Sequence, residues 1–290
     1  MEYIIKEIRS QLNMTQAEFA EVLNTAFATI NRWENGKAFP SQMAQDNLLK
    51  LCIENDIDVM SLIENKINMA IEKLNIPNDR MVLYHGSKSG IVGDIMPKSR
   101  IQCDFGAGFY MGSIPRQPLT LVCSFPKAKF YIVSIPKDIK NVRTFNDDLD
   151  WAMFIGLNRK KMDNVKDSAI YNKYSALSNG IDFMVGSIAN DRMYQVLDDF
   201  YEGTITDAVL VSCLSALNLG KQYVCITEAA CKQVKIEAEI TLSDFEKEYI
   251  KKISNDYRSE GLRLADEIYK KHRREGKYFD EIIEEGMING

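Results

Sequence analysis

Two short stretches of the chain place polar and aromatic side chains beside glycines, the residue types that a site for a flat ligand needs. The first is Tyr84-His85-Gly86-Ser87, which holds one of the two histidines. The second is Asp104-Phe105-Gly106-Ala107-Gly108-Phe109-Tyr110, through which no helical pattern runs. Glycine lets backbone approach a ligand closely or take a positive φ, and a neighbouring ring offers a face for stacking. Either stretch alone suits an ordinary strand end, but the two in this order favour a binding site.

These two stretches resemble the NAD-binding signature of ADP-ribosyltransferases of the diphtheria-toxin and poly(ADP-ribose) polymerase type, and in particular a small bacterial family with that fold. Three further stretches carry the same resemblance: Leu149–Phe154, Asp182–Arg192 and Leu219–Val224. The resemblance spans about residues 80–240. It implies a domain that uses NAD as a substrate and transfers its ADP-ribose to an acceptor.

The resemblance also implies roles for single residues. His85 is expected to bind the ribose hydroxyls of the nicotinamide half of NAD, and Tyr110 to stack on the nicotinamide ring. Gly86 is expected to offer its backbone N–H and C=O to the nicotinamide amide. The other expected NAD contacts are Ser87, Phe105, whose ring would close the opposite side, and Gly108. By the same resemblance, the segment Ser212–Lys221 is expected to recognise the acceptor.

Gln222 completes the expected catalytic set of His85, Tyr110 and Gln222. In active members of the resembling superfamily a Glu stands at this place, just before the strand that here reads Tyr223–Thr227. That Glu bonds the ribose 2′-OH and stabilises the cation formed as nicotinamide leaves. A glutamine can hold the hydroxyl but brings no negative charge, and electrostatic stabilisation is often the largest catalytic contribution. If the protein is a weakened transferase, Gln222→Glu is expected to speed C–N cleavage about tenfold or more. If the glutamine is instead tuned to a particular acceptor, the same variant should release nicotinamide to water and modify its target less.

Residues 1–56 predict a small domain of four helices. The strings Met14–Ala20, Ile30–Lys37 and Pro40-Ser41 resemble the helix-turn-helix of phage repressors, and Thr15 with Glu18 predicts a capping box on the second helix. In such domains the third helix lies in the major groove of DNA. The candidate DNA contacts are Gln16, Ala26, Phe27, Thr29, Asn31 and Arg32.

The charge of this domain is unusual for a DNA-binding segment. Its 56 residues hold five Lys and Arg against eight Asp and Glu. Contacts from basic residues to phosphates supply much of the affinity for DNA. We therefore expect a homodimer that binds a palindromic operator weakly, or a domain that contacts protein instead.

The rest of the chain divides by pattern. Residues 57–80 predict one amphipathic linker helix, which packs on the next domain or pairs with its own copy. Residues 81–240 mix strands and helices irregularly, which predicts an α+β domain containing a helix over 148–162 and another capped by Asn190 or Asp191. Residues 241–290 predict a helical tail interrupted at Gly261. The expected fold is thus multidomain, with an all-α helix-turn-helix domain before the α+β domain and the tail.

Composition excludes several classes of protein. The 290 residues carry a net charge of −5, which argues against a general binder of polyanions. Six cysteines without a CxxC pair, and only two histidines, give no metal-ligand spacing, so no metal is expected. Scattered cysteines and the lack of a signal peptide or a membrane-length apolar stretch predict a cytoplasmic protein with no membrane partner.

Three functions stay open. The first is an NAD-dependent mono-ADP-ribosyltransferase fused to a repressor-like domain, acting as a toxin-like, phage-defence or self-regulating effector. Its acceptor would be a protein, DNA or RNA. The second is a transcription regulator that senses NAD or ADP-ribose without transfer activity, which the glutamine at position 222 favours. The third is an NAD glycohydrolase, with water as the acceptor.

Overall fold

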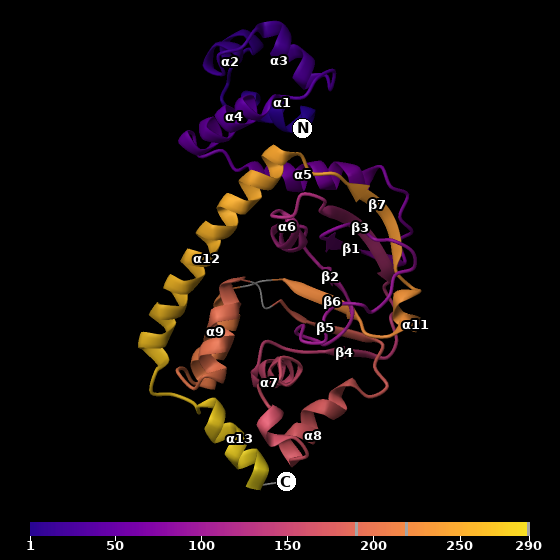
Figure 1. Ribbon diagram of the computed structural model, residues 1–290, viewed down its shortest axis with the longest axis vertical. Helices are drawn as coiled ribbons and strands as arrows, with labels where there is room; N and C mark the ends of the chain where they lie inside the picture. Colours follow the sequence, from indigo (N-terminus) through magenta and orange to yellow (C-terminus); the bar gives the residue numbers. More distant parts are fainter. Residues whose placement is uncertain (189–190, 218–219, 289–290) are drawn as a thin grey trace.

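The structure is a computed structural model that describes residues 1–188, 191–217 and 220–288. Four helices form the N-terminal domain at one end of the molecule (Figure 1), namely α1 (Glu2–Gln11), α2 (Gln16–Val22), α3 (Phe27–Glu34) and α4 (Gln42–Glu54). The predicted capping box is confirmed, because Thr15 and Glu18 exchange both side-chain to backbone hydrogen bonds at the start of α2. The Ser41 hydroxyl caps α4 with a single hydrogen bond, which it accepts from the Ala44 N–H.

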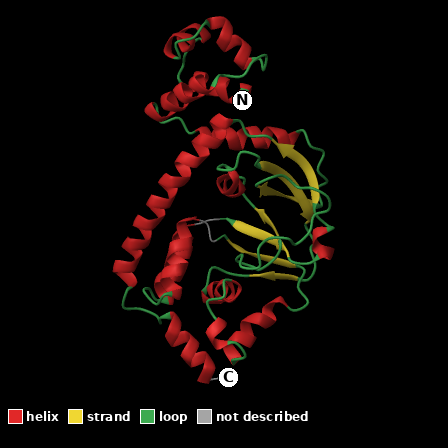
Figure 2. Ribbon diagram, in the orientation of Figure 1, coloured by secondary structure: helices red, strands yellow, loops and turns green. Residues whose placement is uncertain are grey.

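The described residues form a seven-stranded sheet in the order β4-β5-β6-β2-β1-β3-β7. Its strands are β1 (Arg80–Ser87), β2 (Phe109–Gly112), β3 (Lys129–Pro136), β4 (Val142–Thr144), β5 (Phe183–Ser187), β6 (Lys221–Cys225) and β7 (Lys235–Ile240). Neighbours are antiparallel except for the parallel pair β4 and β5. The strands β1 and β2 pair at one position, Tyr84 with Gly112, and then separate. The sheet therefore opens into two halves, β7-β3-β1 and β2-β6-β5-β4 (Figure 2).

Helices cover the half that contains β5 and β6. They are α7 (Leu149–Asn158), α8 (Ala169–Ser175), α9 (Asp191–Tyr201), α10 (Asp207–Leu217) and α13 (Phe279–Ile288). Trp151 and Phe154 of α7 join Met184 of β5 and Phe200 of α9 in a single buried apolar cluster. Two short helices lie elsewhere: α6 (Arg116–Val122) packs on β1, and α11 (Glu228–Cys231) follows β6.

The N-terminal domain shares its core with the other half-sheet. The helix α5 (Val59–Glu72) and the start of α12 (Asp244–His272) lie between them, and α12 then follows one side of the molecule as far as α13 (Figure 1). Ile63 of α5 and Ile250 of α12 lie in one apolar cluster with Ile5 of α1 and Phe130 of β3. Residues 57–80 were expected to pack on the next domain or to pair with their own copy. In the structure α5 packs on the next domain. The cluster thus packs the N-terminal helices against the sheet through α5 and α12.

The predicted fold class is confirmed: a helical helix-turn-helix region precedes an α+β domain and C-terminal helices. Some predicted details are wrong. The helix α12 continues through Gly261 without a break, and α7 ends at Asn158 rather than at 162. Ser212 lies within α10, so most of the expected acceptor segment is helical. The proposed cap Asn190 lies outside the described residues.

No helix in the described part of the chain is both long enough and apolar enough to cross a membrane.

Candidate functional site

A cavity of about 1140 Å³ opens where β1 and β2 separate. Ligand pockets commonly measure about 300–1,000 Å³, so this one has room for a dinucleotide-sized molecule. Strands β1, β2 and β6 line it, together with the loop 88–108 and α6. The site residues from the sequence that lie in its wall are His85, Gly86, Ser87, Gly108, Tyr110 and Gln222.

The imidazole of His85 is fixed by two neighbours. Its Nδ1 lies 2.7 Å from the carbonyl oxygen of Tyr110, and its ring stacks on Phe109 with the centroids 4.2 Å apart. Because a carbonyl can only accept, Nδ1 carries the proton. Burial lowers the pKa of His85, although the bond to Tyr110 acts in the opposite direction. The ring is therefore neutral near pH 7, and its Nε2 is a hydrogen-bond acceptor.

Tyr110 is held by the glycine loop that precedes it. Its hydroxyl donates to the Gly106 carbonyl at 2.8 Å and accepts from the Phe105 N–H at 3.0 Å. Gly106 has a φ of +76°, which closes the loop around the hydroxyl. Gly108 packs against β6, where an added Cβ would come within 3.0 Å of the Cys225 carbonyl. With its hydroxyl engaged in the loop, the Tyr110 side chain packs against the apolar core on one side and lines the cavity on another.

Phe105 departs from the expectation that its ring would close the site. The ring is 3% exposed and packs on Phe145, with centroids 5.5 Å apart, and on Phe154. It belongs to the apolar core that contains Trp151 and Phe154 of α7 and not to the cavity wall. An aromatic residue beside a glycine suits either place, so the sequence did not distinguish them.

Gly86 is small because α6 lies directly on it. A Cβ at this position would meet the Pro118 carbonyl oxygen at 2.7 Å and the Cγ1 of Val122 at 2.8 Å. The neighbouring Ser87 donates its hydroxyl to the Gly90 carbonyl at 2.9 Å and so fixes the turn after β1. The packing of α6 therefore requires a glycine at position 86, and Gly86 also lies in the cavity wall.

The Gly86→Ala variant is expected to lose about 1–3 kcal/mol of stability, because the methyl group forces α6 away from β1. Thermal and urea unfolding of this variant measure the loss. Ser89→Ala, which changes an exposed residue just after β1, serves as the control. An alanine at 86 that unfolds like wild type would show that α6 can shift freely.

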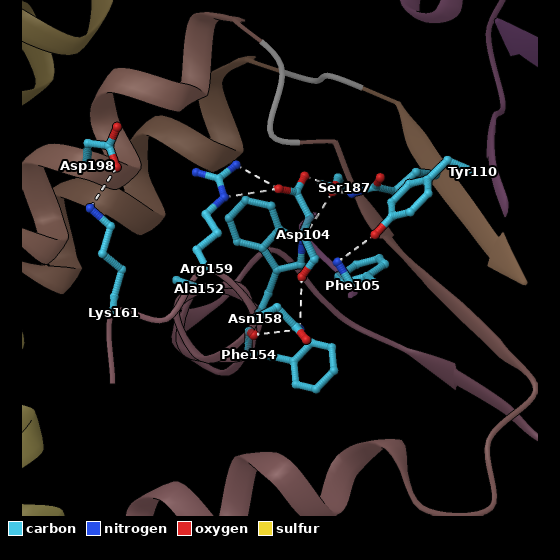
Figure 3. Close-up of polar contacts among 12 residues, drawn as sticks. Asp104, Phe105, Tyr110, Ala152, Phe154, Asn158, Arg159, Lys161, Ser187 and Asp198 are labelled. Carbon is cyan, nitrogen blue, oxygen red and sulfur yellow. Dashed lines mark hydrogen bonds and ion pairs between the residues drawn. The ribbon is translucent and has the colours of Figure 1, made fainter. Parts of the chain in front are cut away.

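Gln222 lies within β6 rather than before it, and its side chain is buried. Its Nε2 donates to the Ser187 carbonyl at 3.0 Å and lies 3.4 Å from Oδ2 of Asp104. Asp104 in turn binds Arg159 through Oδ1, at 2.6 Å from Nη2 (Figure 3). The Asn158 amide donates to the Asp104 carbonyl at 3.0 Å. Gln222 thus belongs to a polar network that ties β6 to the glycine loop and to the end of α7.

Several cavity residues escaped the sequence reasoning. Arg159 follows an apolar helix and stacks over the Tyr194 ring at 4.4 Å, a contact that exists only in the folded chain. Glu64 of α5 binds Arg116 of α6 at 3.1 Å. Lys98, Arg100 and Asn68 also line the cavity. The loop 88–108 carries basic residues near glycines, and that pattern is the signal from which Lys98 and Arg100 could have been found.

The candidate DNA contacts divide into exposed and engaged residues. Phe27 and Arg32 are exposed on α3, as is Ala26 at its N-cap, and Phe27 keeps 55% of its surface accessible. Thr29 is half-buried and lines a groove of about 430 Å³ together with Arg32. The exposed set is therefore available to DNA.

Gln16 and Asn31 make contacts within the domain. The Gln16 Nε2 donates to Oε2 of Glu34 at 2.6 Å, and Asn31 donates to the Gln16 Oε1 at 3.3 Å. Arg9 binds the other oxygen of Glu34 at 2.6 Å. This network joins α1, α2 and α3, so a role of Gln16 in DNA contact comes in addition to a structural one.

Comparison with protein families places the site in a domain. Residues 81–236 match the family described as a protein of unknown function, DUF3990, which is more than half of the chain. The chain belongs to the DUF3990 family. Residues 5–52 match the helix-turn-helix family HTH_3, which implies DNA binding by the N-terminal helices. No match exists among the curated proteins or among the solved structures. All the cavity residues from β1, β2 and β6 lie inside the DUF3990 domain.

Proposed function

We propose that the DUF3990 domain of this chain is an NAD-dependent mono-ADP-ribosyltransferase, joined to a helix-turn-helix domain that binds an operator as a homodimer. The observation that carries this proposal is the convergence of His85, Tyr110 and Gln222 from three strands on the wall of one large cavity. Their order in the chain is the order of the signature that the sequence resembles. Neither feature alone would support an enzyme, because each residue type also occurs in ordinary strand ends.

The chemistry of each side chain suits its role. The neutral His85 offers Nε2 as an acceptor for a ribose hydroxyl, and the ring of Tyr110 suits stacking on nicotinamide. Lys98 and Arg100 line the same cavity and suit the pyrophosphate. In the proposed reaction the bond between nicotinamide and ribose C1′ breaks, and nicotinamide leaves with the electron pair. The acceptor then bonds to C1′ and releases a proton.

Between about pH 8 and pH 5, any loss of NAD affinity is expected to be centred below pH 6.5. Burial lowers the pKa of His85 below its ordinary value of 6.5, so the neutral ring, which keeps its acceptor, is the main form at and above that pH. Protonation, which would remove the acceptor, is shifted to lower pH. Calorimetric titrations across the range measure the affinity. A decline centred at or above pH 6.5 would contradict the neutral form.

Incubation with NAD labelled on its adenylate phosphate, in the presence of cell lysate, tests the function. We expect release of nicotinamide together with transfer of label to a macromolecule, and loss of both in His85→Ala. Separate nuclease and protease digestion then assigns the acceptor as nucleic acid or protein. Release of nicotinamide without labelling would instead identify an NAD glycohydrolase.

A second candidate function is an NAD-sensing regulator, and the position of α5 favours it. Glu64 and Asn68 of this helix line the cavity, whereas Ile63 and Ile67 lie in the core shared with α1. A ligand in the cavity would therefore touch the helix that supports the DNA-binding domain. Since linkage is reciprocal, NAD should change DNA affinity by the factor by which DNA changes NAD affinity. Absence of turnover together with such coupling would make the regulator the better account.

A further inference from the structure

Asp104 fixes the direction of the Gln222 side-chain amide. The Gln222 Nε2 has two acceptors, the Ser187 carbonyl at 3.0 Å and the Asp104 carboxylate at 3.4 Å. An amide nitrogen has two hydrogens, so both are directed toward these partners and the oxygen Oε1 is the end that remains to accept from a ligand. Gln222 lines the cavity with only 5% of its surface exposed, so this direction is set by the protein and not by solvent.

The carboxylate of Asp104 is itself held in place. Its Oδ1 accepts from Arg159 at 2.6 Å through Nη2 and at 3.2 Å through Nε, which leaves Oδ2 directed at Gln222. The side chains of Asp104 and Arg159 are 15% and 8% exposed. Asn158 fixes the backbone of the same residue from α7. Low exposure strengthens such contacts, because less water screens them.

We propose that Asp104 is a positioning residue that acts through Gln222 and replaces, across this hydrogen bond, the carboxylate that the glutamine lacks. A charged acceptor on Nε2 polarises the amide and increases the negative partial charge on Oε1. That oxygen then faces the ribose at which positive charge develops when nicotinamide leaves with its electron pair. Neither Asp104 nor Gln222 forms a covalent bond to the substrate, and neither takes up a proton. This inference rests on the proposed transferase function.

The proposed role of Asp104 predicts that positions 104 and 222 together must carry one negative charge and not two. In Gln222→Glu, a second carboxylate would stand beside Asp104, and like charges at this distance disfavour ionisation of both. The acceleration expected from the sequence for Gln222→Glu is therefore replaced by a loss. Adding Asp104→Asn removes the repulsion, and the asparagine amide can donate to the new carboxylate. The double variant keeps one negative charge, which is moved from residue 104 to residue 222.

Nicotinamide release tests the inference in five proteins: wild type, Asp104→Asn, Gln222→Glu, the double variant, and the control Asp147→Asn. Asp147 contacts Ser187 and Lys221 and is not among the residues that line the cavity. The Asp147→Asn substitution therefore removes one negative charge, as Asp104→Asn does, without changing a side chain that bonds the Gln222 amide. We expect each single change in the pair to lower kcat at least about tenfold with KM within about twofold. The double variant should recover to within about threefold of wild type. An Asp104→Asn variant that behaves like Asp147→Asn, or a double variant no better than Gln222→Glu, would overturn the inference.

A second readout does not depend on turnover. In protein labelled with ¹⁵N-glutamine, the side-chain signals of Gln222 are identified by their disappearance in Gln222→Glu. We expect slow hydrogen exchange for this amide in wild type and faster exchange, with shifted signals, in Asp104→Ala. Unchanged signals in Asp104→Ala would overturn the positioning role. If wild type released no nicotinamide in any lysate, the transferase function would fail, whereas these signals would still decide whether Asp104 orients the amide.

Discussion

The Gln222→Ala variant is expected to release nicotinamide about 10²–10³ times more slowly than wild type. Its affinity for NAD should stay within about threefold. In the proposed reaction Oε1 of Gln222 contacts the ribose where positive charge develops, and a contact that strengthens in the transition state affects the rate rather than ground-state binding. Single-turnover rates and calorimetric titration of the same preparations measure the two quantities separately.

A control for this variant is Gln195→Ala, which removes an exposed glutamine of α9 that donates to Asp199 in its own helix. It should keep both rate and affinity. A loss of affinity in Gln222→Ala as large as the loss of rate would mean that Gln222 holds substrate and contributes nothing special to cleavage. An unchanged rate would remove Gln222 from the mechanism.

The second large effect is expected in the DNA-binding domain, where Glu34→Ala should cost about 3 kcal/mol of unfolding free energy. The Glu34 side chain is 4% exposed and receives Arg9 and Gln16, both at 2.6 Å. Its removal leaves the largely buried charge of Arg9 without its partner. Urea unfolding followed by circular dichroism measures the loss.

The contribution of Glu34 should also depend on pH. Burial opposes ionisation, but hydrogen bonds from Arg9 and Gln16 lower the pKa of this carboxyl below its ordinary value of 4.5. A lowered folded-state pKa gives stability that is present above 4.5 and is lost as the pH falls through the folded value. The difference between wild type and Glu34→Ala should therefore shrink in acid. Glu21→Ala, an exposed glutamate of α2, serves as control, and an equal, pH-independent loss in both variants would contradict the role of the network.

The DNA-binding domain was predictable because its signals are local. A capping residue, a helical repeat of apolar residues and a stop at Gly36 are each contained within a few positions. The place of α5 was not predictable, since an amphipathic helix carries the same pattern whether it packs on its own chain or on a copy. The long α12 was interrupted in the prediction at Gly261, although packing against α9 and α10 supports the helix there.

In the site, the residues next to glycines were found, but their partners were not. His85 and Tyr110 stand in recognisable stretches, whereas Arg159 is 55 residues away from the Asp104 that it binds. Phe105 and Tyr110 lie in the same stretch and yet face the core and the cavity respectively, which only the backbone path through Gly106 decides. Contacts between a strand and a distant loop, such as Gln222 of β6 to Asp104 before β2, depend on strand order, and the sequence carries no direct signal for that order.

The central claim is that the cavity between the two half-sheets binds NAD through His85. Calorimetric titration of the full chain with NAD at neutral pH tests it most directly, with His85→Ala examined under the same conditions. We predict saturable binding of one NAD per chain in wild type, and binding weakened at least about tenfold in His85→Ala, since a buried contact to the ribose is lost. Absence of binding in wild type, or equal affinity in the two proteins, would contradict the claim.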